Sequence, residues 1–313
     1  MADTIGTPDL VRPAPEVRSP GRTPRSGRGV RLTQARSLVG TVPFFAYVTI
    51  FLIIPTLVVV IGAFAGDDGG FTLANVRALT DSYILDAFGR SILLSAVTAL
   101  LGAVFGALLA YALVTARPGG LLRRGVTAAT GVLAQFGGVT LAFAFIATIG
   151  LSGFLTEFLR DDVGIDLYAN GVWLFELPGL ILVYTYFQIP LMVIVFLPAL
   201  DGIRPQWREA TESLGGTTWQ YWSRVAGPLL APAFLGSTLL LFANAFSAYA
   251  TAAALVSQGN PIIPLQIRGA LTSEVVLGQA NLGKAMALGM VVVVAVVMSL
   301  YALLQRRTAR WLG

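Results

Sequence analysis

The sequence contains no cysteine and no histidine. The missing cysteine excludes disulfide frameworks and zinc–thiolate sites, and the missing histidine excludes catalysis by an imidazole base or nucleophile. Charge is also scarce: 12% of the residues are charged, against about a quarter in soluble domains. In contrast, 56% of the 313 residues are hydrophobic. This balance predicts a membrane protein.

Six long windows of the sequence contain no Asp, Glu, Lys or Arg. An ionised group in the middle of a bilayer is costly, and a spanning helix needs roughly 20 apolar residues. The fifth window, 225–267, exceeds one span and contains turn residues at 257–261, so its helix is expected to end near Val256. The sequence therefore predicts an all-α polytopic membrane protein with six transmembrane helices, at 41–65, 88–115, 126–150, 178–200, 229–256 and 284–305.

The distribution of basic residues predicts the orientation of these helices. With the N-terminus in the cytoplasm, the inner segments hold 16 of the 21 basic residues, as the positive-inside rule requires. Both termini are then cytoplasmic, and the net charge of +5 needs no nucleic-acid partner. Residues 1–36 are expected to form a disordered basic cytoplasmic tail. Two interpretations of this tail remain open: an arm that binds anionic membrane lipid, or a topology signal alone.

The cytoplasmic segment 201–228 is too long for a simple connector and is predicted to form two short helices. Pro205 suits the first turn of a helix, where a missing N–H costs nothing. Gly215 and Gly216 are expected to end that helix with a left-handed cap. Thr217 can cap the next helix, and Pro228 marks the return to the membrane.

This segment resembles the cytoplasmic loop motif of binding-protein-dependent ABC importer permeases, Glu-Ala-Ala, three residues, Gly, nine residues, Ile-x-Leu-Pro. Here Glu209-Ala210-Thr211 precedes Gly215 by the same three residues, and nine more lead to Val225-Ala226-Gly227-Pro228. Thr211 stands in place of Ala, Val225 in place of Ile, and Gly227 in place of Leu. The resemblance implies the type I permease fold and a multi-pass protein of the bacterial cytoplasmic (inner) membrane.

The resemblance also implies how energy reaches the chain. In such importers the short helix before the glycine docks in a cleft of a separate ATPase, which moves it as a lever. The implied partners are two ATPase subunits, a second permease that is homologous or identical, and an extracytoplasmic substrate-binding protein. The expected ATPase-coupling residues are Glu209, Ala210, Thr211, Leu214, Gly215 and Pro228. The competing interpretation is an amphipathic loop helix that lies on the bilayer.

The resemblance divides the chain into four parts. The tail 1–36 precedes a first transmembrane helix and outer loop at 37–87, and the core permease domain follows at 88–305, with 306–313 as a cytoplasmic C-terminus.

One motif would place a nucleotide-binding site in this chain itself, and we reject it. Gly278 to Lys284 matches Gly-x4-Gly-Lys, but the next residue is Ala285, where a phosphate-binding loop needs Ser or Thr to hold magnesium. The chain is therefore expected to bind no cofactor or metal and to carry no catalytic residue, with ATP and magnesium on the partner ATPase.

Polar residues inside spans are candidates for the translocation path. Small polar side chains also serve helix packing, so both roles remain open for them. No carboxylate lies deep in a span, so a cationic cargo would have to meet dipoles, carbonyls or aromatic faces. The path candidates are Gln135, Tyr184, Gln188, Asn244, Ser247, Tyr249 and Thr251.

The cargo is predicted only from finer likeness. The sequence looks most like the spermidine/putrescine group in two places. These are the loop motif, in its form Leu214-Gly215-Gly216, and the run 242–251 with 264–267 after it. Importers of ferric iron, thiamine, phosphonate or sugar are the alternatives. A stand-alone secondary transporter would predict inverted repeats and buried ionisable residues, and neither is visible in the sequence. A membrane enzyme is disfavoured by the missing His and Cys.

Overall fold

The computed structural model describes residues 41–309, except 67, 118–119, 257–261 and 273–278. The predicted tail 1–36 and residues 310–313 at the C-terminus therefore lie outside the described residues. The chain divides into two units, 1–55 and 56–313. The described part of the first unit is helical from Thr41 and includes a π-helical turn, η1 (Thr49–Ile53).

Six helices of the described residues are long and apolar enough to cross a membrane, which confirms the predicted number of spans. Their termini agree with the sequence prediction to within four residues in the first, fourth and sixth helices, whereas the second helix begins six residues earlier than expected, at Ser82 instead of 88. The described residues contain no strand beyond one isolated bridge between Ala65 and Phe71. The six candidate spans are Thr41–Ala63, Ser82–Thr115, Gly138–Val163, Leu177–Asp201, Thr218–Ser247 and Ala280–Leu303.

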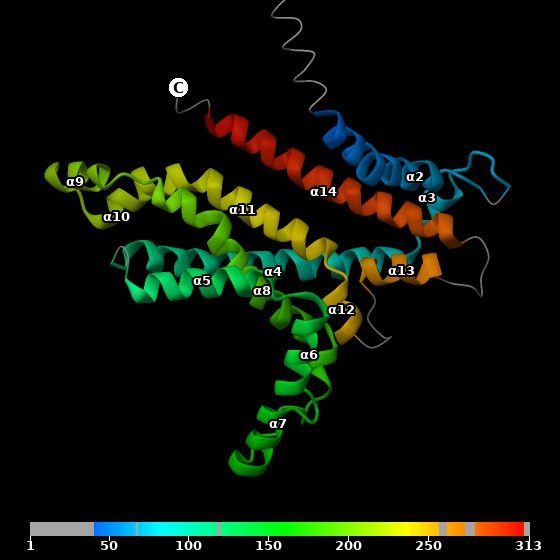
Figure 1. The fold of residues 1–313 in the computed structure, drawn as a ribbon, viewed down its shortest axis with the longest axis horizontal. Coiled ribbons are helices and arrows are strands. Elements are labelled where there is room, and N and C mark those ends of the chain that lie inside the picture. The colour runs from blue at the N-terminus through cyan, green and yellow to red at the C-terminus, as the bar shows by residue number, and fades with distance from the viewer. Residues whose placement is uncertain (1–40, 67, 118–119, 257–261, 273–278, 310–313) are drawn as a thin grey trace, which may run out of the picture. The chain divides into compact units, whose positions relative to one another are not determined.

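The centre of the second unit is the contact of α4 (Ser82–Thr115) with α8 (Leu177–Asp201) and α11 (Gly227–Ser247) (Figure 1). Gly102 and Gly106 lie one turn apart on α4, and the absence of side chains there lets α8 approach closely. A Cβ on Gly106 would lie 2.5 Å from the Cβ of Met192. The α4–α8 contact therefore depends on the small size of these residues.

Two predicted helices are broken, and these predictions of single helices were wrong. The third, expected at 126–150, is split into α5 (Leu121–Gln135) and α6 (Gly138–Ile149), because Phe136 and Gly137 leave the helical conformation and Gly138 has a φ of +70°. Glycine adopts that left-handed conformation without the steric cost of a side chain.

The fifth helix, expected at 229–256, ends at Ser247, and α12 (Ala250–Leu255) follows. Ala248 is extended, and its carbonyl oxygen accepts a hydrogen bond of 2.7 Å from the Tyr184 hydroxyl of α8. This bond satisfies a backbone group that the break leaves free of the helical pattern. The two breaks are neighbours, since Thr251 donates to the carbonyl of Gly138 at 3.2 Å.

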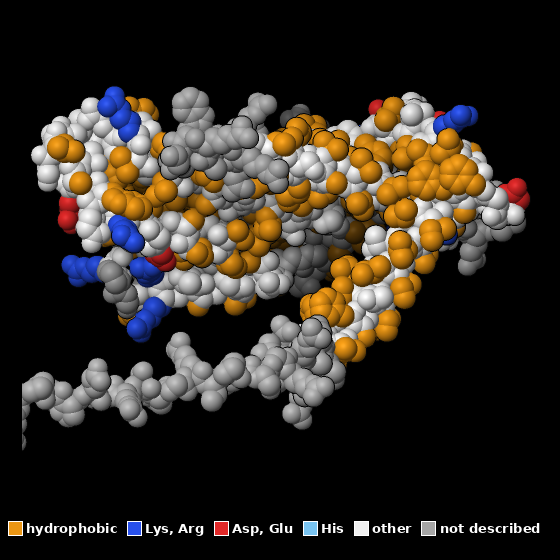
Figure 2. Space-filling view, turned by 90° about the horizontal axis from the view of Figure 1, so that it is seen from above, with side chains coloured by type: hydrophobic (Ala, Val, Ile, Leu, Met, Phe, Trp, Pro, Cys, Tyr) orange, Lys and Arg blue, Asp and Glu red, His pale blue; other side chains and the backbone are white. Residues whose placement is uncertain are grey.

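The remaining elements connect or flank this bundle (Figure 1). They are α2 (Ile54–Ala63), α3 (Ala74–Ala78), α7 (Phe154–Phe158), η2 (Leu159–Val163), η3 (Trp173–Phe175), α9 (Pro205–Ser213), α10 (Thr218–Tyr221), η4 (Trp222–Ala226), α13 (Ile263–Thr272) and α14 (Gln279–Ala309). Within the second unit, α9 and α10 lie at one end of α11 and α12 and α13 at the other (Figure 1). In the space-filling view, basic side chains gather at the end that carries α9 and α10, and the surface between the ends is mainly hydrophobic (Figure 2).

Candidate functional site

The segment after α8 forms the two short helices that the sequence predicts. Arg204 is extended, with a ψ of 129°, and Pro205 is the first residue of α9. Because proline fixes its own φ and disfavours a helical residue before it, this pair sets where the helix begins. The predicted start of α9 is therefore confirmed.

Two glycines end α9, each for a different reason. The N–H of Gly216 donates to the carbonyl of Thr211 at 2.9 Å and the N–H of Gly215 to that of Glu212 at 3.0 Å, which is the Schellman pattern. Gly215 has a φ of +75°, so a side chain there would strain the backbone. Gly216 has no such φ, but a Cβ on it would lie 2.7 Å from the Thr211 methyl carbon.

The second short helix, α10, begins with a capping box. The N–H of Gln220 donates to the Thr217 hydroxyl oxygen, and the N–H of Thr217 donates to the Gln220 side-chain oxygen at 2.8 Å. Two backbone donors at the helix start are thereby satisfied. The predicted cap at Thr217 is confirmed.

A π-helical turn, η4, joins α10 to α11 and explains why Gly227 departs from the family pattern. The N–H of Gly227 donates to the carbonyl of Trp222, five residues earlier. A Cβ at position 227 would lie 2.4 Å from that carbonyl oxygen. The wider turn thus requires glycine where the family pattern has leucine.

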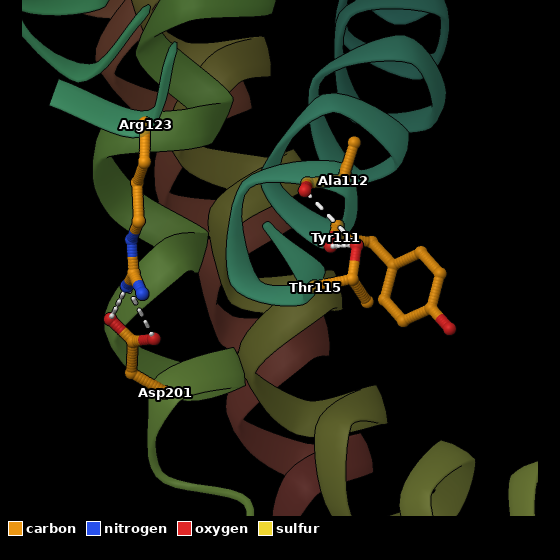
Figure 3. Close-up of polar contacts among 5 residues, drawn as sticks. All are labelled: Tyr111, Ala112, Thr115, Arg123 and Asp201. Carbon is orange, nitrogen blue, oxygen red and sulfur yellow. Dashed lines mark hydrogen bonds and ion pairs between the residues drawn. The ribbon is translucent and has the colours of Figure 1, made fainter. Parts of the chain in front are cut away.

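Aromatic packing and one ion pair attach this segment to the bundle, and a second ion pair lies within α9. The Trp222 ring meets the Tyr111 ring of α4 edge-on, with 5.3 Å between centroids. Arg208 and Glu212 pair along α9 at 2.9 Å, and this hydrogen bond and charge raise the pKa of Arg208, which stays a cation. Arg123 at the start of α5 donates to Asp201 at the end of α8, at 3.1 Å (Figure 3).

The coupling candidates fall into two groups in space. A cavity of about 410 Å³ between α9 and the start of α11 brings Ala210, Thr211 and Leu214 together with Pro228. Glu209 is exposed and does not line that cavity. Leu214 is 88% exposed and Trp219 of α10 is 79% exposed. We did not expect Trp219 from the motif, although exposed aromatic side chains are common in protein interfaces.

The path candidates divide into buried and exposed residues. Tyr184, Gln188 and Thr251 are buried and hold the helices together near the breaks, since each donates to a carbonyl of another helix or of the helix break. The Gln188 amide donates to Leu241 at 2.8 Å, while its side-chain oxygen is buried without a partner among the described residues. The candidates with exposed or half-buried side chains are Gln135, Asn244, Ser247 and Tyr249.

The comparisons with known proteins identify the family. Residues 140–310 match the binding-protein-dependent transport system inner membrane component family. The chain belongs to this family. The match confirms the predicted placement of the protein in the bacterial inner membrane, whereas the orientation of its termini stays a prediction.

Three curated relatives of this permease are permease proteins with different cargoes in their names. The chain is 28% identical to a putative ferric transport system permease from Haemophilus influenzae over 61% of this chain and 30% of that protein. It is 28% identical to the sulfate permease of Escherichia coli over 55% and 59%, and 27% identical to its molybdenum permease over 38% and 49%. The chain thus spans less than two thirds of the length of these relatives.

Solved structures show that the fold is that of ABC importer permeases. The bacterial transporter that imports alginate matches with a TM-score of 0.73 over 90% of this chain and 99% of the matched chain, at 18% identity. The MetNI methionine transporter matches with a TM-score of 0.51 over 72% and 95%, also at 18% identity. These matches confirm the predicted permease fold.

Proposed function

We propose that this permease is the membrane subunit of an ATP-driven importer and that it receives energy through α9. The observation that carries the proposal is a short helix with a defined cap at its C-terminal end, which exposes Glu209 and Leu214 at one end of the bundle. A helix ended in this way moves as a rigid piece. The chain itself supplies no complete phosphate-binding loop, so ATP hydrolysis is assigned to two separate ATPase subunits.

The surface of α9 has the chemistry of a docking element. Leu214 offers an apolar anchor that is almost fully exposed, Glu209 offers a carboxylate for a basic partner, and Ala210 permits a close approach. A buried apolar anchor surrounded by polar contacts is the usual anatomy of a protein interface. We place an ATPase cleft over this helix and over Trp219 of the neighbouring α10.

An extracytoplasmic binding protein and a second permease complete the proposed importer. A related alginate transporter has been solved in complex with an alginate pentasaccharide-bound periplasmic protein, and the family is defined by dependence on such proteins. We assign the binding protein to the end of the bundle opposite α9. The second permease is either a homologue or another copy of this chain.

Replacement of Leu214 by Glu is expected to remove the ATPase from the purified complex. A charge at the centre of an apolar contact loses the anchor and leaves an unpaired carboxylate in the interface. Leu121→Glu is the matched control, because Leu121 is also 88% exposed and lies at the start of α5. Affinity purification of the permease measures both. Retention of the ATPase by the Leu214 variant would contradict the coupling role of α9.

For the cargo, we infer a small inorganic anion in preference to the polyamine that the sequence favours. Arg268 of α13 donates to the Tyr249 hydroxyl, and its guanidinium lies 5.7 Å from the centroid of the Tyr249 ring. Tyr249 follows Ala248 in the break between α11 and α12. Among the described residues Arg268 has no carboxylate within ion-pair distance. A fixed cation with unused donors attracts anions and repels polycations.

Two further observations support an anionic cargo. The six charge-free windows of the sequence contain no carboxylate to bind a polyamine. Two of the relatives carry sulfate and molybdenum in their names. Ferric iron and a polyamine are the alternatives that the next experiment separates from this assignment.

Arg268→Glu is expected to lower oxyanion uptake by roughly tenfold, because it reverses the charge at the mouth of the path. The measurement is uptake of labelled sulfate, molybdate, ferric iron and putrescine by the complete importer in proteoliposomes. Arg77→Glu is the matched control, since Arg77 is an exposed outer arginine on α3 with no ion pair among the described residues. Uptake of putrescine and of no anion by the unaltered importer would contradict the assignment.

A further inference from the structure

The half-helix α5 is held to the bundle mainly by α8. Among its described side chains, Thr130 is the single one that is buried. Its C-terminal end is the break at Phe136 and Gly137, so no helical hydrogen bonding ties it to α6. A helix with so little buried surface and a joint at one end can move as a body against its neighbour.

One ion pair fixes the other end of α5. The guanidinium of Arg123 donates to both carboxylate oxygens of Asp201, at 3.1 and 3.4 Å (Figure 3). It is the only ion pair between α5 and α8 among the described residues. Asp201 is the last residue of α8, and α9 begins at Pro205, so the same pair links α5 to the start of the coupling segment.

The geometry of this pair suits positioning better than it suits stability. Both side chains are partly exposed, 25% for Arg123 and 47% for Asp201, and exposed ion pairs contribute little to folding. Both contacts come from one guanidinium nitrogen, Nη2, and they hold this end of α5 beside Asp201. Loss of the pair should therefore leave the fold intact and change where α5 lies.

The far end of α5 reaches the broken region of the membrane helices. Its 15 residues make a rod of about 22 Å, and its last residue is Gln135. Gly138 follows the break, and its carbonyl accepts the Thr251 hydroxyl of α12. A displacement of Arg123 would therefore be delivered next to the contact of α6 with α12.

We propose that α5 is the lever that carries the movement of α9 to this break, with Arg123 and Asp201 as positioning residues at its driven end. The inference rests on the proposed function, because it assumes that an ATPase moves α9. Beyond that function, the inference specifies the helix of the bundle that receives the movement and the atoms that transmit it.

The test uses the complete importer and does not depend on knowing the cargo. The chain has no cysteine, so Val132→Cys on α5 and Val195→Cys on α8 give two defined sites for spin labels on this subunit. The distance between them is measured without nucleotide and with ATP and vanadate. In the unaltered pair, ATP is expected to produce a second distance, whose population Arg123→Glu lowers roughly tenfold.

The charge exchange Arg123→Glu with Asp201→Arg is expected to restore the ATP-dependent distance, which a merely structural loss would not do. Arg124→Glu is the matched control, because Arg124 is the next residue, is exposed and has no ion pair among the described residues. An ATP-dependent distance that persists in Arg123→Glu, or that is absent without mutation while the ATPase remains bound, overturns the lever. An ATPase that never joins the complex overturns the coupling role of α9 instead.

Discussion

Transport is expected to be lost when Glu209→Arg is combined with Gly215→Pro, while the protein still inserts and accumulates in the membrane. Arginine at 209 reverses the exposed charge offered to the ATPase. Proline cannot adopt the φ of +75° found at 215 and removes the N–H that donates to Glu212. Both changes lie in exposed positions, in α9 and in the turn that ends it, so the membrane bundle should remain folded. ATP-dependent uptake and ATPase retention are the measurements.

A second double variant provides a close control for this result. Glu157→Arg with Gly164→Pro makes the same two substitutions in α7 and at the end of η2, where Gly164 has a φ of +79°. That segment lies away from α9, so the ATPase should stay bound. Normal uptake by the α9 variant, or loss of the ATPase from both variants, would count against the coupling role.

Gly106→Leu is expected to prevent formation of a stable bundle. A Cβ at 106 would approach the Met192 Cβ to 2.5 Å and the carbonyl oxygen of Ile189 to 2.7 Å. Overpacking of a core costs about 1–3 kcal/mol when side chains can yield, and here backbone must move as well, so a larger cost is expected. The measurement is the yield and melting temperature of the purified permease.

Gly89 gives the comparison that isolates this contact. It lies on the same helix, and a Cβ there would meet no atom within 4 Å. Gly89→Leu should therefore fold normally, and the better helix propensity of leucine favours a slight gain of about 1 kcal/mol. Equal melting temperatures for the two leucine variants would show that α8 does not pack closely on Gly106.

The sequence predicts most of the membrane fold because one simple rule governs which segments can span the bilayer: a charged residue is costly at its centre. That rule predicts six spans, which is the number of candidate spans among the described residues, although the fifth, Thr218–Ser247, begins within the segment 201–228. The same rule is silent about helix breaks, since Phe136 and Ala248 are uncharged. The breaks depend on tertiary hydrogen bonds such as that from Tyr184 to Ala248, which no local pattern records.

The candidate site shows the same division between local and distant causes. Both ends of α9 and the start of α10 were predictable, because caps are formed by residues within one turn of each other. The pair of Arg123 with Asp201 was not, because its partners are 78 residues apart. The cargo could not be derived from the spans at all, since they contain few polar groups and Arg268 lies outside every charge-free window.

The π-helical turn η4 acts on the helix as an insertion of one residue would. Each residue of an α-helix rotates the chain by about 100°. A hydrogen bond that spans five residues rather than four therefore changes the direction in which all later side chains point around the helix axis. The face of α11 that carries Asn244 and Ser247 therefore depends on Trp222–Ala226, some twenty residues away. Removing one residue from that turn would rotate α11 without altering a single path residue.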